Sequence, residues 1–345
     1  MVPGRQGFSR TAGVIRRLLV AALILAAMAR AASNWWDARI SEPHLGSTTD
    51  GRLLTVPFGA SVRGIGRMLQ EADVIRSGLV FAAYVRWSGS DPLQAGEYLF
   101  ENPASLTQVV QVLREGRVHQ YRITVPEGMT LDEIIDRFVQ EGLGRRHELE
   151  PLAGRIDLLG GLDPEATDLE GYLFPDTYHF TRSDQELTLV STLVTRFKEV
   201  WTPQRQKRAD DLDLTIREVI TLASLIEKEA ALPAERALVA AVFHNRLRRN
   251  IKLDCDPTII YAIRKSGDYD GVLHKSDLSL DSPYNTYLYA GLPPGPIANP
   301  GTASIDAALH PAPVRHLYFV SRNDGSHVFS TSYREHQRAV RRYQR

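Results

Sequence analysis

Hydrophobic and polar positions divide the start of the chain into a basic end, an apolar run and a polar stretch. Residues 1–17 contain four arginines and no acid, and residues 18–29 are apolar without interruption. These twelve apolar residues are fewer than the roughly 20 needed to cross a bilayer, but 18–36 number 19 with one charge, Arg30. The pattern predicts a cytoplasmic segment at 1–17, a transmembrane anchor at 18–36 and a linker at 37–50. A cleaved signal peptide and a buried helix stay open as alternatives.

One local pattern is repeated in the next part of the chain. Residues 55–61 read Thr-Val-Pro-Phe-Gly-Ala-Ser, and residues 124–130, 69 positions later, read Thr-Val-Pro-Glu-Gly-Met-Thr. Each copy predicts a short strand, a Pro-x-Gly turn and an amphipathic helix capped by Ser or Thr. A looser third copy begins at Gly96, with Ser105 as the helix cap. We therefore predict a small α+β module at 51–120, which acts either as scaffold alone or as a glycan-binding module.

Residues 121–345 are predicted to form a second domain. The spacing of apolar residues predicts one helix from Leu214 to about Ala231 and another from Pro233 to Arg249. Residues 283–301 contain five prolines and three glycines, which predicts an irregular loop. The remaining elements are a connection at 145–168, a helix at 304–309, strands at 317–321 and 327–330, and a basic, solvent-facing helix from Tyr333.

Aromatic residues and acids are concentrated at residues 169–178, where Glu170 and Asp176 flank Tyr172 and Phe174. Aromatic rings present flat apolar faces with polar edges, and carboxylates accept hydrogen bonds from hydroxyl groups. The segment is therefore either a sugar-binding wall with Glu170 as a substrate ligand, or a buried turn.

Glu229 is the candidate for acid–base chemistry. The helix that carries it is apolar almost all round up to Ile226, so we expect the helix to be buried. Glu229 follows Ile226 by three positions and Leu222 by seven, and it therefore extends an apolar stripe. Desolvation raises the pKa of such a carboxyl toward the range that a general acid needs. Glu227 points to the opposite side, and an ion pair of Glu229 at the helix end is the structural alternative.

Further polar residues follow in three short groups, 244–246, 254–258 and 284–287. Asn and Tyr side chains donate hydrogen bonds without carrying charge, which suits an N-acetyl carbonyl or a sugar hydroxyl. Each residue alone also has a structural interpretation. The candidate substrate-binding residues are Asn285, Tyr284, Asn245, Asp256, Tyr287 and Glu170.

Composition narrows the class of protein. Lys+Arg and Asp+Glu both total 41, and this zero net charge argues against a dedicated nucleic-acid-binding protein. The single cysteine, Cys255, excludes an intrachain disulfide and any multi-cysteine metal site. The chain also lacks the His-Glu-x-x-His, Gly-x-Ser-x-Gly and phosphate-binding glycine motifs. We therefore predict no metal and no cofactor.

Several motifs occur in one order between residues 50 and 340. They are Glu170-Gly171-Tyr172, then residues 174–177, 223–229 (Ala-Ser-Leu-Ile-Glu-Lys-Glu), 243–247, 256–261, 284–287, 291–301, 310–312 and 317–320. This set resembles the endolytic murein transglycosylase (YceG-like) family. The resemblance implies a LysM-like module near residues 50–120, a catalytic domain after it, and Glu229 as the catalytic glutamate. Asp254 departs from the pattern, since Gln is expected there.

The resemblance also implies an activity and a place. The expected activity is cleavage of nascent peptidoglycan strands between N-acetylmuramic acid and N-acetylglucosamine, leaving 1,6-anhydro ends, with one Glu as acid and then base. A lysozyme-like hydrolase and a non-catalytic glycan-binding scaffold for wall synthases stay open. We expect a single-pass inner-membrane protein with its carboxyl-terminal domain in the periplasm or outer wall space, and peptidoglycan synthases as partners. The fold class is α+β: a membrane helix, the LysM-like module and a mixed α/β catalytic domain with a buried catalytic helix.

Overall fold

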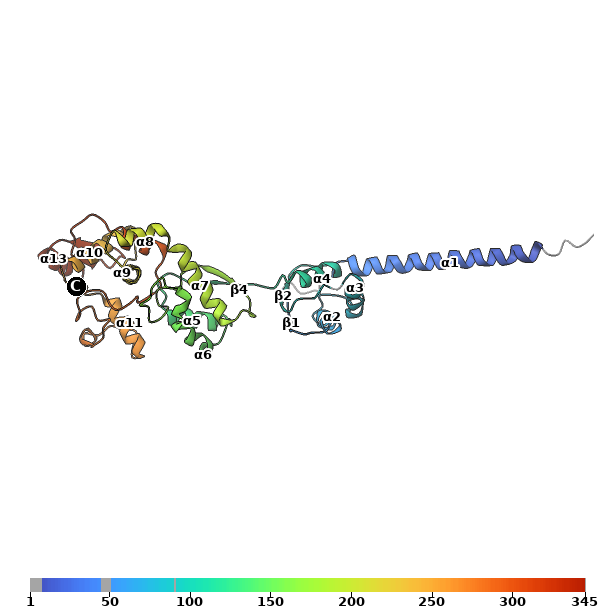
Figure 1. Cartoon of the computed structure of the whole chain (residues 1–345), viewed down its shortest axis with the longest axis horizontal. Helices are drawn as coiled ribbons and strands as arrows, with labels where there is room; N and C mark the ends of the chain where they lie inside the picture. Colours follow the sequence, from blue (N-terminus) through green and yellow to red (C-terminus); the bar gives the residue numbers. More distant parts are fainter. Residues whose placement is uncertain (1–7, 45–50, 90, 345) are drawn as a thin grey trace, which may run out of the picture. The chain divides into compact units, whose positions relative to one another are not determined.

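The computed structural model describes residues 8–44, 51–89 and 91–344. The chain divides into two compact units, with the boundary between Gln120 and Tyr121 (Figure 1). Each unit has its own hydrophobic core. Within the described residues, strands occur only as three two-stranded antiparallel ladders among many helices. The α+β fold class is therefore confirmed, with helices dominant.

The amino-terminal helix, α1 (Phe8–Ser41), contains the segment expected to span a membrane. Its large apolar side chains between Val14 and Met28 are exposed. In the ranges that the structure describes, no helix combines the length and the apolar character that a membrane span requires. Helix α1 also continues through 37–41, part of the expected linker, because Ile40 packs into the core of the first unit. The rest of that linker, 45–50, lies outside the described residues, as do residues 1–7.

The first unit is built from two of the three repeat copies. Strands β1 (Arg52–Val56) and β2 (Gly96–Phe100) pair antiparallel, and the helices α2 (Val62–Glu71), α3 (Gly78–Trp87) and α4 (Leu106–Glu115) cover them. Ser61 caps α2 and Ser105 caps α4, so the predicted strand–turn–helix copies are confirmed. Helices α2 and α3 cross at two glycines: a Cβ on Gly66 would lie 2.7 Å from the carbonyl oxygen of Gly78.

The remaining repeat copy begins the second unit. Strand β3 (Tyr121–Thr124) pairs with β4 (Thr177–Phe180), and Thr130 caps α5 (Leu131–Gln140) with a full capping box. The expected connection at 145–168 contains short helical turns, which are α6 (Arg146–Leu149) and the 3₁₀ turns η1 (Glu150–Gly154) and η2 (Ile156–Leu159). Helix α7 (Glu186–Val200) follows β4.

The aromatic segment at 169–178 is a buried turn, which is the second of its two interpretations; its rings do not form an exposed wall. Tyr172 is 1% exposed, and its ring meets that of Phe197 edge-on in the core. Gly171, at φ +87°, permits a close approach: a Cβ there would lie 2.5 Å from Pro296 and 2.9 Å from Ile220. The turn is thus packed directly against α9 and the proline-rich loop.

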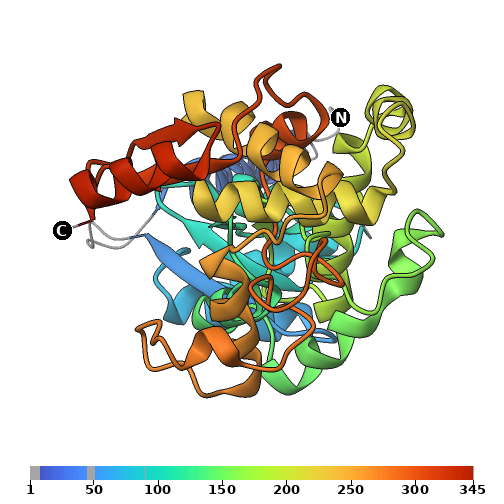
Figure 2. The ribbon, with the colours of Figure 1, turned by 90° about the vertical axis from the view of Figure 1, so that its left-hand side faces the viewer.

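Helix α9 (Ile216–Glu229) is at the centre of the second unit. Its residues from Val219 to Ile226 are all buried, as the apolar pattern predicted. Among the described residues, four helices pack against it: α8 (Pro203–Asp210), α10 (Arg236–Arg248), α11 (Asp256–Ser266) and α12 (Thr302–Leu309). The 3₁₀ turn η3 (Pro233–Glu235) contacts α10, and the turn η4 (Asp277–Ser279) contacts α11. Strands β5 (Tyr318–Ser321) and β6 (His327–Ser330) pack with α13 (Tyr333–Tyr343), drawn in red in Figure 2. The arginines of α13 are exposed, as expected.

Candidate active site

Glu229 is the last residue of α9, at the point where the buried helix reaches the surface. Ile226 is 0% exposed, whereas Glu229 keeps part of its surface accessible. Its neighbours point elsewhere. Glu227 pairs with Arg236 of α10 at 3.3 Å and accepts a hydrogen bond from the Gly301 backbone, and the Lys228 ammonium donates to the Gly128 carbonyl. The prediction that Glu227 and Glu229 face different sides is confirmed.

The carboxyl of Glu229 contacts a thiol rather than a cation. Cys255 Sγ donates to Oε1 of Glu229 at 3.2 Å. In the described ranges no ion pair engages Glu229, so the ion-pair alternative is wrong for this structure. Desolvation raises the pKa of Glu229 to about 7, Asp256 also raises it, and the Cys255 thiol and His327 lower it. A carboxyl with its pKa near neutrality can both give and take a proton at physiological pH.

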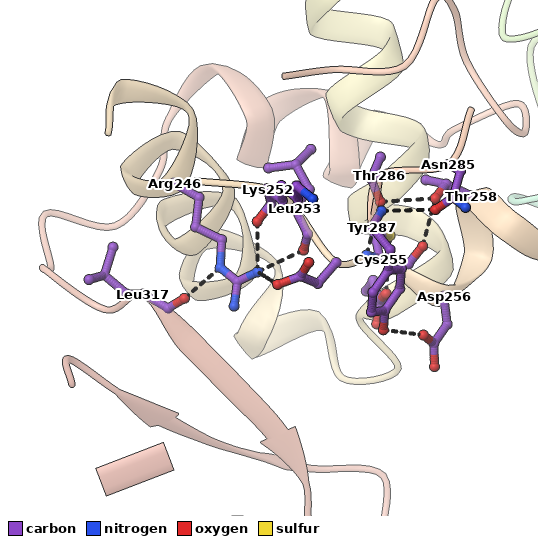
Figure 3. A network of polar contacts seen from close by, with 12 residues as sticks. Arg246, Lys252, Leu253, Cys255, Asp256, Thr258, Asn285, Thr286, Tyr287 and Leu317 are labelled. Carbon is purple, nitrogen blue, oxygen red and sulfur yellow. Dashed lines mark hydrogen bonds and ion pairs between the residues drawn. The ribbon is translucent and has the colours of Figure 1, made fainter. Parts of the chain in front are cut away.

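A threonine pair fixes the backbone that carries Cys255. The Cys255 N–H donates to Thr286 Oγ1 at 3.0 Å, and the Thr258 hydroxyl donates to the Cys255 carbonyl at 2.7 Å (Figure 3). Tyr287 directly follows Thr286 in the chain, and its hydroxyl donates to Asp256 at 2.6 Å. Of the candidates from the sequence, Asp256 and Tyr287 are therefore brought together with Glu229.

Arg246 of α10 secures the residues just before Cys255. Its guanidinium donates to the carbonyls of Lys252, Leu253 and Leu317, and it pairs with Asp254 at 3.0 Å (Figure 3). Asp254 lies at φ +48°, a left-handed conformation that Asp tolerates. Asp254, which stands where Gln is expected, therefore forms an ion pair with Arg246, and this pair holds the backbone of this segment in place.

The side chains of the two asparagine candidates form hydrogen bonds within the protein. Asn285 is 0% exposed and donates to the carbonyls of Leu278 and Leu280. Asn245 is 7% exposed and donates to the carbonyls of Val314 and His316. The structure therefore gives both residues anchoring roles, which sequence spacing could not distinguish from sugar binding.

Glu170 and Tyr284 belong to a second cluster around Tyr261. Glu170 is 5% exposed and accepts hydrogen bonds from the Leu131 N–H, the Asn299 amide and the Tyr261 hydroxyl. Its burial is the main cause of a pKa raised to about 8. The Tyr284 ring lies 5.0 Å from that of Tyr261. Glu170 joins the start of α5 to the loop at Asn299 and borders a cavity of about 330 Å³.

Sequence reasoning missed Cys255 as a neighbour of Glu229, and it also missed a Glu–His pair. His327 Nδ1 lies 2.7 Å from Glu235, whose other oxygen accepts the His327 backbone N–H, and both side chains are mostly buried. A lone imidazole at the start of a short strand was the available signal, but its partner is 92 positions away. Among the described residues, no group of three or more His, Cys, Asp or Glu is arranged to hold a metal ion.

The chain is therefore an α+β protein of two units. In its second unit, Glu229 lies at the end of a buried helix, and the pKa of its carboxyl is raised toward neutrality. The YceG-like family model matches residues 54–342, and the chain belongs to this family. A relative named endolytic murein transglycosylase, from Bacillus subtilis strain 168, is 35% identical over 308 residues, which is 84% of either chain.

A second relative of that name, from Streptococcus pneumoniae strain D39, is 29% identical over 314 residues; the match covers 83% of this chain and 57% of the pneumococcal one. The crystal structure of a putative YceG-like protein from Listeria monocytogenes superposes with a TM-score of 0.58 at 29% identity. That superposition covers 84% of this chain and 99% of the other.

Proposed function

We propose that this protein is an endolytic lytic transglycosylase that cuts peptidoglycan glycan strands. The observation that carries the proposal is Glu229, a partly exposed carboxyl with no cation partner in the described residues and a pKa raised to about 7. The names of the relatives from two organisms support the same activity.

The proposed reaction uses one carboxyl twice. Protonated Glu229 donates its proton to the glycosidic oxygen between N-acetylmuramic acid and N-acetylglucosamine, and the C1–O bond breaks. The N-acetyl oxygen of the substrate stabilises the cationic C1, as in substrate-assisted glycosidases. Glu229, now ionised, takes the proton of the C6 hydroxyl, and that oxygen bonds to C1. The products are a 1,6-anhydro end and a new hydroxyl end, and no water is consumed.

We propose Asp256 and Tyr287 as the sugar contacts. Asp256 is close enough to raise the pKa of Glu229, and it accepts a hydrogen bond from Tyr287. Asp256 is exposed and Tyr287 is partly exposed. The other four candidates have a structural role in this proposal: they hold loops and helix ends of the second unit in place. They are Asn245, Asn285, Tyr284 and Glu170.

We propose that residues 51–120 form a LysM-like module that binds the glycan strand. The proposed partner is a peptidoglycan synthase, which supplies the strand. The strand–helix–helix–strand order of β1, α2, α3 and β2 supports such a module.

The end groups of the products test the activity. Uncrosslinked glycan strands incubated with the full-length chain are expected to shorten and to end in 1,6-anhydro-N-acetylmuramic acid, as read by mass spectrometry. Reducing ends would instead show a hydrolase. Unchanged strands that still bind the protein would contradict catalysis and favour a scaffold.

We also propose a location at the inner membrane, with residues 18–36 as the segment that contacts the membrane and residues 51–345 on the outer side. The arginines before residue 18 and the exposed apolar side chains of α1 support it. We expect the full chain in the membrane fraction, resistant to high salt and released by detergent, and cleavable by protease added to spheroplasts. A form lacking residues 1–36 should leave the membrane fraction. A salt-extractable, protease-protected full chain would contradict the location.

A further inference from the structure

Cys255 is placed to act on Glu229 and is fixed in that place. Its thiol donates to Oε1 of Glu229 at 3.2 Å, and the residue is 1% exposed. Thr286 and Thr258 hold its backbone N–H and carbonyl, and the two threonine hydroxyls lie 3.0 Å apart. The thiol therefore has little freedom to turn away from the carboxyl.

The contact distinguishes the two oxygens of Glu229. Oε1 accepts the S–H, so a proton on Oε1 would compete with the thiol for the same side of the carboxyl. The acidic proton is therefore favoured on Oε2, the oxygen that the thiol leaves free. Burial raises the pKa of Cys255 well above its ordinary value, and the sulfur keeps its hydrogen at neutral pH. The thiol is thus a neutral donor and not a nucleophile.

We propose that Cys255 is a positioning residue for the catalytic carboxyl: its thiol holds Oε1 and directs the acidic proton of Glu229 to Oε2, toward the glycosidic oxygen. This inference rests on the proposed function, because it assigns a task to one residue beside the general acid. It concerns this chain's own Cys255 and the threonines that fix it.

The charged groups around Glu229 determine its pKa, which is the quantity that a pH profile of the activity measures. Asp256 of α11 raises its pKa, and His327 of β6, held by Glu235, lowers it. Other charged groups on α9 and on the helices packed against it have partners of their own. On α9 these pairs include Glu227 with Arg236, Lys228 with the Gly128 carbonyl and Arg217 with Asp163. On the neighbouring helices they include Arg246 with Asp254, Arg248 with Asn245, Arg264 with Glu133, Lys265 with Asp168, and Asp306 with Arg205. Removal of the thiol leaves these pairs in place.

Cys255→Val and Cys255→Ser separate a positioning role from simple packing. Val removes the donor and is somewhat larger than Cys, whereas Ser keeps a donor in a smaller side chain, so melting temperatures are compared for both. For Val we expect kcat to fall about tenfold, the effect of one lost hydrogen bond to a carboxylate, with KM little changed. The descending limb of the pH profile should move to higher pH, because the thiol lowers the pKa of Glu229. Ser should restore most of the rate, with its limb at or below that of the original protein.

A contrast variant and a direct titration complete the test. Asp256→Asn should move the same limb to lower pH, because Asp256 raises the pKa of Glu229. The ¹³C-carboxyl NMR titration of Glu229, assigned by its absence in Glu229→Gln, reads the pKa without activity. The inference is overturned if Val titrates and turns over like the original protein, or if Ser is as impaired as Val while both melt normally. If Glu229→Gln cleaves strands at the original rate, Glu229 is not the general acid and the positioning role of Cys255 is overturned with it. If the original protein leaves strands uncut, the proposed function fails, and the titration still decides whether Cys255 lowers the pKa of Glu229.

Discussion

Glu229→Gln is expected to lower the rate of glycan-strand cleavage by about 10²–10⁴-fold, the usual contribution of a general acid–base group. The amide has nearly the shape of the carboxyl and can still accept from the Cys255 thiol, but it has no proton to give. Strand binding and the melting temperature should stay close to those of the original protein. Because only protonated Glu229 donates, cleavage by the original protein should decline as the pH rises through about 7, the pKa of this group.

Glu227→Gln is the matched control on the same helix. Glu227 pairs with Arg236 and accepts from Gly301, so its loss should cost stability and leave the chemical step intact. Initial rates on isolated strands and thermal melts distinguish the two variants. Undiminished cleavage by Glu229→Gln would remove this residue from the mechanism, and an equal loss in both variants would point to disruption of the helix end.

Glu170→Leu is expected to destabilise the second unit by about 3 kcal/mol or more, since each unsatisfied buried donor costs about 1–3 kcal/mol. Leucine would leave the Leu131 N–H, the Asn299 amide and the Tyr261 hydroxyl without this acceptor. Urea unfolding at pH 5 measures the loss. Glu170→Gln is the control, because its amide oxygen still accepts and its NH₂ can donate to the Tyr261 hydroxyl.

The pH dependence of unfolding gives Glu170 a second signature. Its pKa is about 8 in the folded chain and 4.5 ordinarily, so the folded state binds the proton more tightly. Stability is therefore full below pH 4.5 and declines as the pH rises through 8, on the order of a few kcal/mol, since a pKa difference of one is worth about 1.4 kcal/mol. Glu170→Gln should flatten this decline and be more stable than the original protein above pH 8. Glu229 contributes a smaller decline of the same sign up to about pH 7.

Two results would contradict the structural role of Glu170. Equal stability of Glu170→Leu and the original protein would show that the buried hydrogen bonds are dispensable. Normal stability of Glu170→Leu with a selective loss of strand binding would restore Glu170 as a substrate ligand, the role that the aromatic segment predicted.

The sequence by itself determined the local elements and identified Glu229 as the candidate for acid–base chemistry. Ser61, Ser105 and Thr130 marked helix starts because capping is a local exchange between a hydroxyl and backbone N–H groups a few positions later. The apolar stripe that ends at Glu229 predicted a raised pKa, because helical periodicity places Ile226 and Leu222 on its face. These inferences needed only neighbours within two turns of helix.

Only the tertiary structure decided what the polar side chains touch. Cys255 meets Glu229 across 26 positions, Asn245 meets the carbonyl of His316 across 71, and Asn299 meets Glu170 across 129. An Asn that binds a sugar and an Asn that anchors a loop have the same chemistry, and burial among distant segments distinguishes them. Hydrophobic periodicity fixes which face of an element is buried, but the partners of a buried polar group depend on how those faces pack together.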